Sequence, residues 1–400
     1  MDFYHIFSIS FSPLALIFLC TGLLSAIAGV FFGLRPLWTV ARRLPSVSAN
    51  QASDKPLPKI SVIVYAPSRL ETIPKYLEEL LRQDYPDFEV IVVFSASAEA
   101  TATLTEELAA ATNLSFTFIP PGSLNLSRRK LALTIGMKAA KGDVAVFTSS
   151  NCHIPSCRWL SEMAAPFRNP EVALSLGYCH HDFSELSSAG RRFRTMDATL
   201  TDCSWIDRAL AGKPFRGDAA NMAIRRDTFF ANKGFARTIS LHCGEDDLFV
   251  REIARPGNTA VAISADSILS SSWGPSADKA LRTRKAQWDF TRYYLPQGPF
   301  RLAGFASMTQ WITIFCLAAG ALSGLPSLLP ATAALVILAA FWWLETTLYI
   351  HAARRLGLPA LRLSLPFLML WRPVGNFIFR LRHRSRRYSN FTWNRHGSRK

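Results

Sequence analysis

The sequence predicts an α/β protein in which a mostly parallel sheet, with helices on both faces, is joined to an N-terminal transmembrane helix and a C-terminal transmembrane hairpin. Strand patterns that alternate with helical patterns in the middle of the chain predict the sheet. Long charge-free segments on either side of that region predict the membrane helices. The composition agrees, because 49% of the 400 residues are hydrophobic and only 18% are charged. An ordinary water-soluble protein of one small domain is therefore excluded.

Two segments are apolar and long enough to cross a bilayer core of roughly 30 Å. Residues 12–34 predict one transmembrane helix, and residues 302–344 predict two helices with a break near Gly324 and Pro326. A cleaved signal peptide is the alternative for the first segment. It is disfavoured because no basic region precedes the segment and no small-residue cleavage site follows it.

Basic residues beside these helices predict how the protein is oriented. They are Arg35, Arg42, Arg43, Arg301, Arg354 and Arg355. The positive-inside rule places all of them on the cytoplasmic side, so we expect an integral protein of the plasma membrane, in bacteria the inner membrane. The seven cysteines are odd in number and lack paired spacing, which is typical of reduced thiols in a cytoplasmic domain.

The C-terminal region is apolar and strongly basic. Centring Arg372 in a bilayer would cost at least about 2.5 kcal/mol, so residues 358–381 predict a broken, interfacial amphipathic segment and not a fourth span. The net charge is +16, and residues 354–400 hold twelve Lys or Arg and no Asp or Glu. We expect this basic end to contact anionic lipid; a solvated tail is the alternative. No nucleic-acid partner is expected, because the charge adjoins membrane segments and no base-stacking motif accompanies it.

The middle of the chain has the size of one domain. Its predicted elements are strands at 59–66, 88–95, 115–120 and 143–149, with helices near 76–81 and 129–140. Parallel sheets bind ligands beyond the carboxyl ends of their strands, so we expect the binding site there. No Walker loop and no GxGxxG follows a strand, which argues against P-loop nucleotide hydrolysis and dinucleotide binding.

These patterns divide the chain into five segments. They are an N-terminal anchor (1–36), a linker (37–58), a cytoplasmic domain (59–296), a transmembrane hairpin (297–353), and an interfacial segment with a basic tail (354–400).

Five motifs occur in order along the chain. They begin with ISVIVYA and RRKLALTIGMKAAKGDVAVFTSSN and continue with FRGDAANMAIRR, CGEDDLFVREI and RTRKAQWDF. In order and spacing they resemble the motifs of membrane-anchored, inverting family 2 glycosyltransferases. The resemblance implies a GT-A nucleotide-sugar fold and transfer of a sugar from a nucleotide donor to a lipid-linked or polysaccharide acceptor.

The resemblance also implies catalytic roles for the acidic motif. Asp246 matches the general base that takes the proton from the acceptor hydroxyl, and Glu245 is the second catalytic candidate. An acidic first turn of a helix is the alternative interpretation. Asn221 and Asp247 are expected on the acceptor side.

Donor-binding residues are expected at the strand ends and in the tryptophan motif. They are Ala66, Ser68, Ser95, Lys130, Ser149, Asn151, Arg284, Lys285, Gln287 and Trp288. Among them, Lys130, Arg284 and Lys285 are the cations expected to stabilise the departing diphosphate.

The chain differs from the family at positions where the family has charged side chains. Ser95 stands where the family usually has the aspartate that holds uracil, and the metal-binding Asp-x-Asp falls on the Ser-Ser-Asn of residues 149–151. No metal ligand is therefore assigned, and binding of Mg2+ or Mn2+ is expected to be weakened. In the Gln-x-x-Arg-Trp motif the Gln and the Arg have exchanged places, as Arg284 and Gln287, while Trp288 is kept.

Two functions stay open at this point. The acidic motif and Trp288 favour an active transferase that is independent of metal or has an atypical metal site. The three lost carboxylates favour a catalytically inactive subunit that binds or scaffolds in a membrane glycan-synthesis assembly. The expected partners are a nucleotide-sugar donor, a lipid or glycan acceptor, the lipid bilayer and a membrane protein.

Overall fold

The computed structural model describes residues 12–43, 56–67, 70–108, 112–120, 126–184, 186–272 and 277–383. Ser68, most of the predicted linker and the basic tail from residue 384 lie outside the described residues. The described chain forms two compact units. We call residues 12–43, 192–204 and 296–379 the membrane unit, and the remaining described residues the sheet unit.

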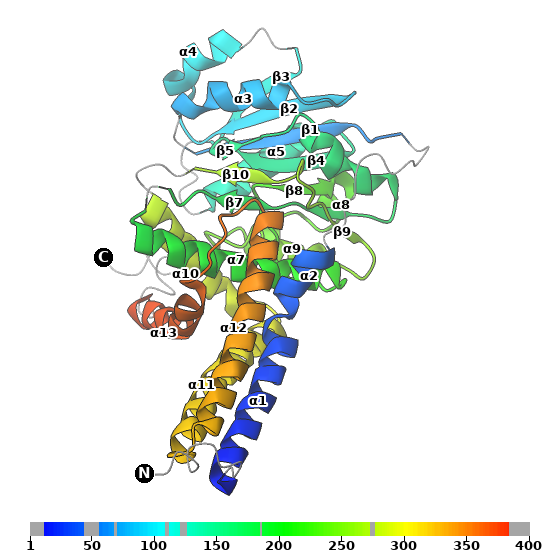
Figure 1. Cartoon of the computed structure of the whole chain (residues 1–400). Coiled ribbons are helices and arrows are strands. Elements are labelled where there is room, and N and C mark those ends of the chain that lie inside the picture. Colours follow the sequence, from blue (N-terminus) through cyan, green and yellow to red (C-terminus); the bar gives the residue numbers. More distant parts are fainter. Residues whose placement is uncertain are drawn as a thin grey trace, which may run out of the picture. The chain divides into compact units, whose positions relative to one another are not determined.

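The sheet unit is built on a seven-stranded sheet in the order β3-β2-β1-β4-β8-β6-β9 (Figure 1). Its strands are β1 (Ile60–Ala66), β2 (Phe88–Phe94), β3 (Leu114–Phe118), β4 (Val144–Ser149), β6 (Leu174–Leu176), β8 (Met222–Arg225) and β9 (Thr259–Val261). Strand β8 runs antiparallel to β4 and β6, whereas the other pairings of this sheet are parallel. The predicted mostly parallel sheet is confirmed, and β1, β2 and β4 end at the same edge.

A second, smaller sheet has the order β5-β10-β7. Its strands are β5 (Cys152–His153), β7 (Cys179–His181) and β10 (Leu269–Ser271). The helices of the sheet unit are α3 (Ile73–Leu81), α4 (Ala98–Leu108), α5 (Arg128–Ala139), α6 (Trp159–Ala164), α8 (Arg226–Ala231), α9 (Leu248–Ile253) and α10 (Ala277–Thr291). Helix α7 (Ser188–Leu210) contributes residues to both units.

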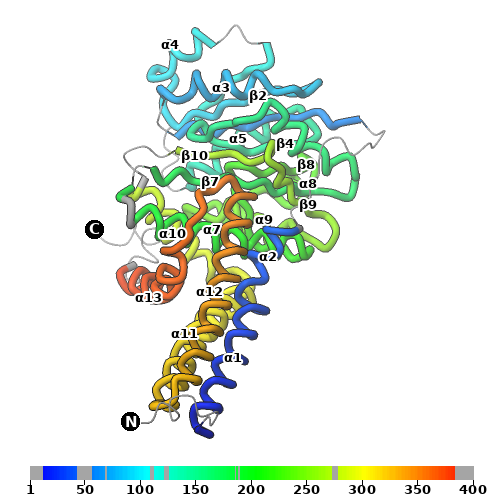
Figure 2. Tube along the Cα trace, in the orientation of Figure 1, coloured from blue at the N-terminus to red at the C-terminus, as the bar shows by residue number. Residues whose placement is uncertain are grey.

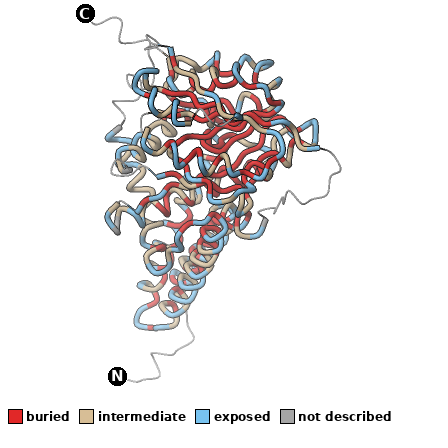
Figure 3. Tube along the Cα trace, turned by 90° about the horizontal axis from the view of Figure 1, so that it is seen from above, coloured by how far each residue is buried: buried red, intermediate tan, exposed pale blue. Residues whose placement is uncertain are grey.

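Helices cover both faces of the larger sheet. Alternate side chains of a strand point to opposite faces, so the apolar side chains of each strand are buried against helices on both sides. Val62 and Val64 of β1 share a buried cluster with Tyr76 of α3. Ile63, between them, lies against Gly136 of α5 on the other face. Strands buried on both faces are hydrophobic along most of their length, which explains why β1, β2 and β4 could be predicted. Figure 3 shows this buried centre in red.

The close approach of α5 to the sheet depends on Gly136. A Cβ atom there would lie 2.4 Å from Ile63 Cγ2, which is far closer than carbon atoms approach each other. We therefore expect Gly136→Ala to lower the free energy of unfolding by about 1–3 kcal/mol, although alanine is the better helix former. Thermal unfolding of the purified protein in detergent measures the change. The matched control is Gly304→Ala, where a Cβ meets nothing within 4 Å; equal melting temperatures for the two variants would contradict the prediction.

The membrane unit contains three helices that are long and apolar enough to cross a membrane. They are α1 (Pro13–Gly33), α11 (Gly298–Ser323) and α12 (Leu329–Arg355), and they lie side by side in Figures 1 and 2. Glycines allow close packing: a Cβ at Gly22 would lie 2.9 Å from Leu317 of α11. The predicted anchor and hairpin are therefore present as helices of sufficient length.

Two further segments of the membrane unit are more helical than the sequence predicts. Helix α2 (Arg35–Arg43) covers the first part of the predicted linker. It packs against α12, and its side chains Leu37 and Val40 are buried. Helix α13 (Leu365–His383) continues through Pro373 without the expected break. The residue before this proline is fixed by an ion pair, in which Arg372 Nε donates to Asp197 Oδ1 at 2.8 Å.

Candidate active site

The carboxyl ends of β1, β2 and β4 are held together by backbone hydrogen bonds. Ser95 N donates to Ala66 O at 3.0 Å, and Ser150 N donates to Tyr65 O at 3.1 Å. Two predicted donor-binding positions, Ala66 and Ser95, therefore lie next to each other at this edge. A third, Ser68, lies outside the described residues.

The segment in the position of Asp-x-Asp consists of neutral residues, two of which make hydrogen bonds that stabilise the fold. Ser149 Oγ donates to Tyr65 O at 3.2 Å, and Ser150 O accepts from Thr72 Oγ1 at 3.2 Å. Asn151 is half-buried beside them. Within the described ranges, no three His, Cys, Asp or Glu side chains come together as a metal site. Since Mg2+ and Mn2+ prefer anionic oxygen ligands beside a diphosphate, these residues do not fit a divalent cation.

The guanidinium of Arg128 binds Ser95, the residue at the position where the resemblance implies a uracil-binding carboxylate. Arg128 Nε donates to Ser95 Oγ at 2.8 Å, and Arg128 Nη2 donates to Ser95 O at 2.6 Å. Arg128 is exposed and is the first residue of α5. The sequence alone did not predict a role for Arg128, although this residue starts the RRK run in which Lys130 was expected to bind the donor.

The predicted donor ligand Lys130 is buried and serves the fold. Its Nζ donates to Thr238 O and to Cys243 O, both at 2.7 Å. Burial lowers the pKa of Lys130, and nearby carboxylates, Glu245 first among them, oppose that shift. The lysine thus holds the loop that leads into the acidic motif against α5.

The three carboxylates of the acidic motif have different environments, and Asp247 is the most enclosed. Its Oδ1 accepts from Leu248 N at 2.7 Å and caps α9, while its Oδ2 accepts from the Thr291 hydroxyl of α10. Burial, with the charge of Asp246 beside it, raises the pKa of Asp247 to about 6. This residue ties α9 to α10; the sequence analysis expected it on the acceptor side.

Asp246 differs because its carboxylate is half-buried and makes no hydrogen bond or ion pair within the part of the chain that the structure describes. The preceding Gly244 has a φ of +96°, which a side chain would disfavour, so the motif turns there. Loss of water contact and the charge of Glu245 raise the pKa of Asp246, while Arg284 and Arg129 lower it. An accessible carboxylate with a raised pKa is suited to accept a proton.

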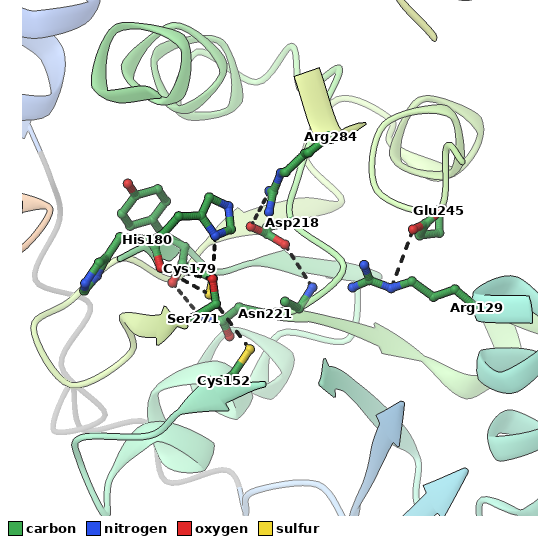
Figure 4. Close-up of polar contacts among 12 residues, drawn as sticks. Arg129, Cys152, Cys179, His180, Asp218, Asn221, Glu245, Ser271 and Arg284 are labelled. Atoms are coloured by element: carbon green, nitrogen blue, oxygen red, sulfur yellow. Dashed lines mark hydrogen bonds and ion pairs between the residues drawn. The ribbon is translucent and has the colours of Figure 1, made fainter. Parts of the chain in front are cut away.

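Two arginine–carboxylate pairs interact electrostatically with Asp246. Arg129 Nε lies 3.5 Å from Glu245 Oε1, and Arg284 Nη2 donates to Asp218 Oδ2 at 2.8 Å (Figure 4). Glu245 Oε2 and Arg129 Nε are buried and have no hydrogen-bond partner among the described residues. The structure thus brings the predicted Glu245 and Arg284 together with Arg129 and Asp218, which the sequence analysis did not assign.

The tryptophan of the exchanged motif lies between two guanidinium groups. Arg284 Cζ is 4.6 Å and Arg216 Cζ is 4.4 Å from the centroid of the Trp288 ring. Such stacking is favourable, and it holds each arginine near an aspartate. Lys285 and Gln287 lie half-buried on the same helix, α10.

The side-chain amide of Asn221 makes all of its hydrogen bonds within the sheet unit. Its Nδ2 donates to Tyr178 O at 2.9 Å and to Ser267 O at 2.8 Å, and its Oδ1 accepts from Trp159 Nε1 at 3.0 Å. These bonds satisfy all donors and the acceptor of a buried amide. We therefore assign Asn221 to the support of the site and not to contact with an acceptor.

Comparison with known proteins gives one family match and several similar solved structures. Residues 61–232 match the family model described as "Glycosyl transferase family 2". The chain is similar to the mannosyltransferase PcManGT from Pyrobaculum calidifontis in complex with GDP-Man and Mn2+, with 19% identity over 89% of this chain and 99% of that chain and a TM-score of 0.49. It is also similar to S. aureus TarS 1–349, with 15% identity over 79% of this chain and 92% of that chain and a TM-score of 0.39. Comparison with curated proteins finds no match.

Proposed function

We propose that this chain, whose residues 61–232 match glycosyl transferase family 2, is a family 2 glycosyltransferase that moves a sugar, with inversion, from a nucleotide-sugar donor to a lipid-linked or polysaccharide acceptor. The observation that carries this proposal is the Asp246 carboxylate. Asp246 is half-buried, its carboxylate has no partner in the described chain, and it interacts electrostatically with the members of two arginine–carboxylate pairs.

The reaction follows from these groups. The acceptor hydroxyl oxygen forms a bond to the anomeric carbon while Asp246 takes its proton. The bond between that carbon and the diphosphate oxygen breaks, and the nucleoside diphosphate leaves with the electron pair. A base on the face opposite the leaving group gives inversion in one displacement. Fixed cations near the leaving diphosphate stabilise its developing charge.

The remaining sequence-predicted residues are kept as donor contacts in this proposal. Ala66 and Ser95 at the strand ends are assigned to the nucleoside, and Lys285, Gln287 and Trp288 of α10 to the sugar diphosphate. What supports the assignment is their place at the carboxyl edge of the sheet or on the helix that carries Arg284.

Calorimetric titration with UDP, GDP and their sugars tests the proposal. Purified protein in detergent should bind at least one nucleotide sugar, and the affinity should fall when the nucleotide lacks its β-phosphate. Absence of binding to all of these nucleotides, with and without Mn2+, would contradict a transferase and leave a subunit that only scaffolds.

We further propose that the protein is integral to the plasma membrane, with the sheet unit on the cytoplasmic side and α13 in the lipid interface. Three long apolar helices support the first part. For α13, the exposed side chains Phe367, Trp371, Ile378 and Leu381 recur at helical spacing and form one apolar face. Arg372 points to Asp197 instead of this face, so the helix can lie flat at the lipid boundary.

Quenching by brominated phospholipid checks the placement of α13. In vesicles brominated near the head groups, Trp371→Phe should lower the fraction of tryptophan fluorescence that lipid quenches. Trp159→Phe removes a fully buried tryptophan of the sheet unit and should raise that fraction. A quenched fraction unchanged by Trp371→Phe would place this face away from lipid.

A further inference from the structure

The carboxylates around Asp246 are matched by cationic side chains of the protein. The carboxylates are Asp218, Glu245, Asp246 and Asp247, and the cations beside them are Arg129, Lys130, Arg216 and Arg284. Arg128 at Ser95 and Lys285 on α10 add further positive charge to the site. A donor diphosphate adds negative charge, and a cation that is already paired with a carboxylate meets that charge by exchanging partners.

The site offers few suitable ligands for a divalent cation. The segment in the position of the metal motif offers two hydroxyl oxygens and one amide, and Ser149 Oγ is engaged with Tyr65 O. Glu245 and Asp218 are paired with arginines, and Asp247 is bonded within the fold, which leaves Asp246 as the one carboxylate of the site without a partner in the described chain. No three potential ligands gather within the described residues. Neutral, engaged ligands would leave such an ion bound mainly by the diphosphate.

The three arginines differ in their freedom to exchange partners. Arg216 is locked, because its side chain is 4% exposed and lies between Trp288 and the fully buried Asp247. Arg284 is 18% exposed and makes a short 2.8 Å bond to Asp218. Arg129 is the freest: it is 28% exposed, and its contact with Glu245 is 3.5 Å long.

Arg129 makes no side-chain hydrogen bond within the described chain, whereas Arg284 donates to Asp218 at 2.8 Å. Arg129 Nε has no hydrogen-bond partner in the described chain, and neither has Glu245 Oε2. A buried, charged group without good hydrogen bonds is costly, so a better partner lowers the free energy. A phosphate oxygen accepts two parallel bonds from a guanidinium, which a 3.5 Å ion pair does not provide.

We propose that Arg129, assisted by Arg284, neutralises the donor diphosphate in place of a divalent cation, and that Arg129 leaves Glu245 for a phosphate oxygen when the donor binds. The inference rests on the proposed function. It assigns a diphosphate-binding role to a residue that the sequence analysis passed over, and it explains how the chain can act with Ser-Ser-Asn at residues 149–151.

Binding of UDP and GDP, measured by calorimetry in EDTA and in Mn2+, tests the inference. The affinity of the nucleotide that binds should agree within about twofold between the two buffers. Arg129→Gln should weaken that binding about tenfold or more, while binding of the matching monophosphate, UMP or GMP, should change less. Arg129→Lys keeps the charge but loses the planar fork, so its loss should be intermediate.

The control variant is Arg82→Gln, which removes an exposed arginine paired with Glu78 on the surface and should bind as the wild type does. Melting temperatures verify that each variant is folded. Binding that EDTA abolishes and Mn2+ restores would overturn the inference but leave the proposed function intact, as would a folded Arg129→Gln variant with unchanged affinity. Failure of both nucleotides to bind the wild type in either buffer would overturn both proposals.

Discussion

Asp246→Asn is expected to lower the rate of sugar transfer by roughly 100- to 10,000-fold, the usual contribution of a general base. The amide has nearly the shape of the carboxylate but cannot take the acceptor proton. Since the Asp246 carboxylate has no partner in the described chain, the fold should tolerate the change. Donor affinity should stay within about threefold of the wild type. Release of nucleoside diphosphate measures the rate, and calorimetry measures the affinity.

The control for this variant is Asp87→Asn, an exposed aspartate paired with Lys59 at the surface. It should transfer sugar at the wild-type rate. An Asp246→Asn variant that keeps more than about a tenth of the wild-type rate would remove Asp246 from the role of base.

The pH dependence of the wild type follows from the same carboxylate. Only the ionised form of Asp246 can accept a proton, and its pKa is raised above the ordinary value of 3.8 by burial and by Glu245. As the pH falls, kcat/KM should therefore decline at a higher pH than an ordinary aspartate would give. A rate that stays constant down to the ordinary range would contradict this environment.

Lys130→Met is expected to have the largest effect on stability. The substitution removes an ammonium that is 0% exposed and leaves the carbonyls of Thr238 and Cys243 without their donor. Each buried carbonyl that loses its partner costs about 1–3 kcal/mol, so the free energy of unfolding should fall by about 2–5 kcal/mol. Transfer should fall too, because the loop before Asp246 loses its support. Thermal unfolding in detergent and nucleotide release measure the two effects.

Lys138→Met is the matched control, because Lys138 lies exposed on the same helix. It should unfold at nearly the wild-type temperature. If Lys130→Met also melted like the wild type and lost only diphosphate affinity, Lys130 would be a donor ligand, as the sequence alone predicts.

The fold could be predicted from the sequence because its signals are local. β1 and β2 are continuous apolar runs buried on both faces, and α1 is a charge-free stretch of sufficient length. Helix α2 was not predicted because only two of its apolar side chains, Leu37 and Val40, are buried. Such a short pattern resembles the start of a linker until its contact with α12 is known.

The site could be predicted only in part because its contacts join distant segments. The RRK run shows that three cations occur together. The sequence does not show that Lys130 donates to buried carbonyls whereas Arg129 pairs with Glu245. Likewise Arg216 stacks on Trp288 from 72 positions earlier in the chain. Pairings of this kind depend on the tertiary structure, and no periodicity or motif spacing reports them.

The most direct test of the account is a balance of products from the purified wild type. The protein is incubated in EDTA with UDP and GDP sugars and with extracted membrane lipids and polysaccharide, and released nucleoside diphosphate is compared with sugar incorporated. The account predicts that one donor yields the two products in equal amounts, with the linkage inverted. Consumption of no donor, in EDTA or in Mn2+, would contradict it.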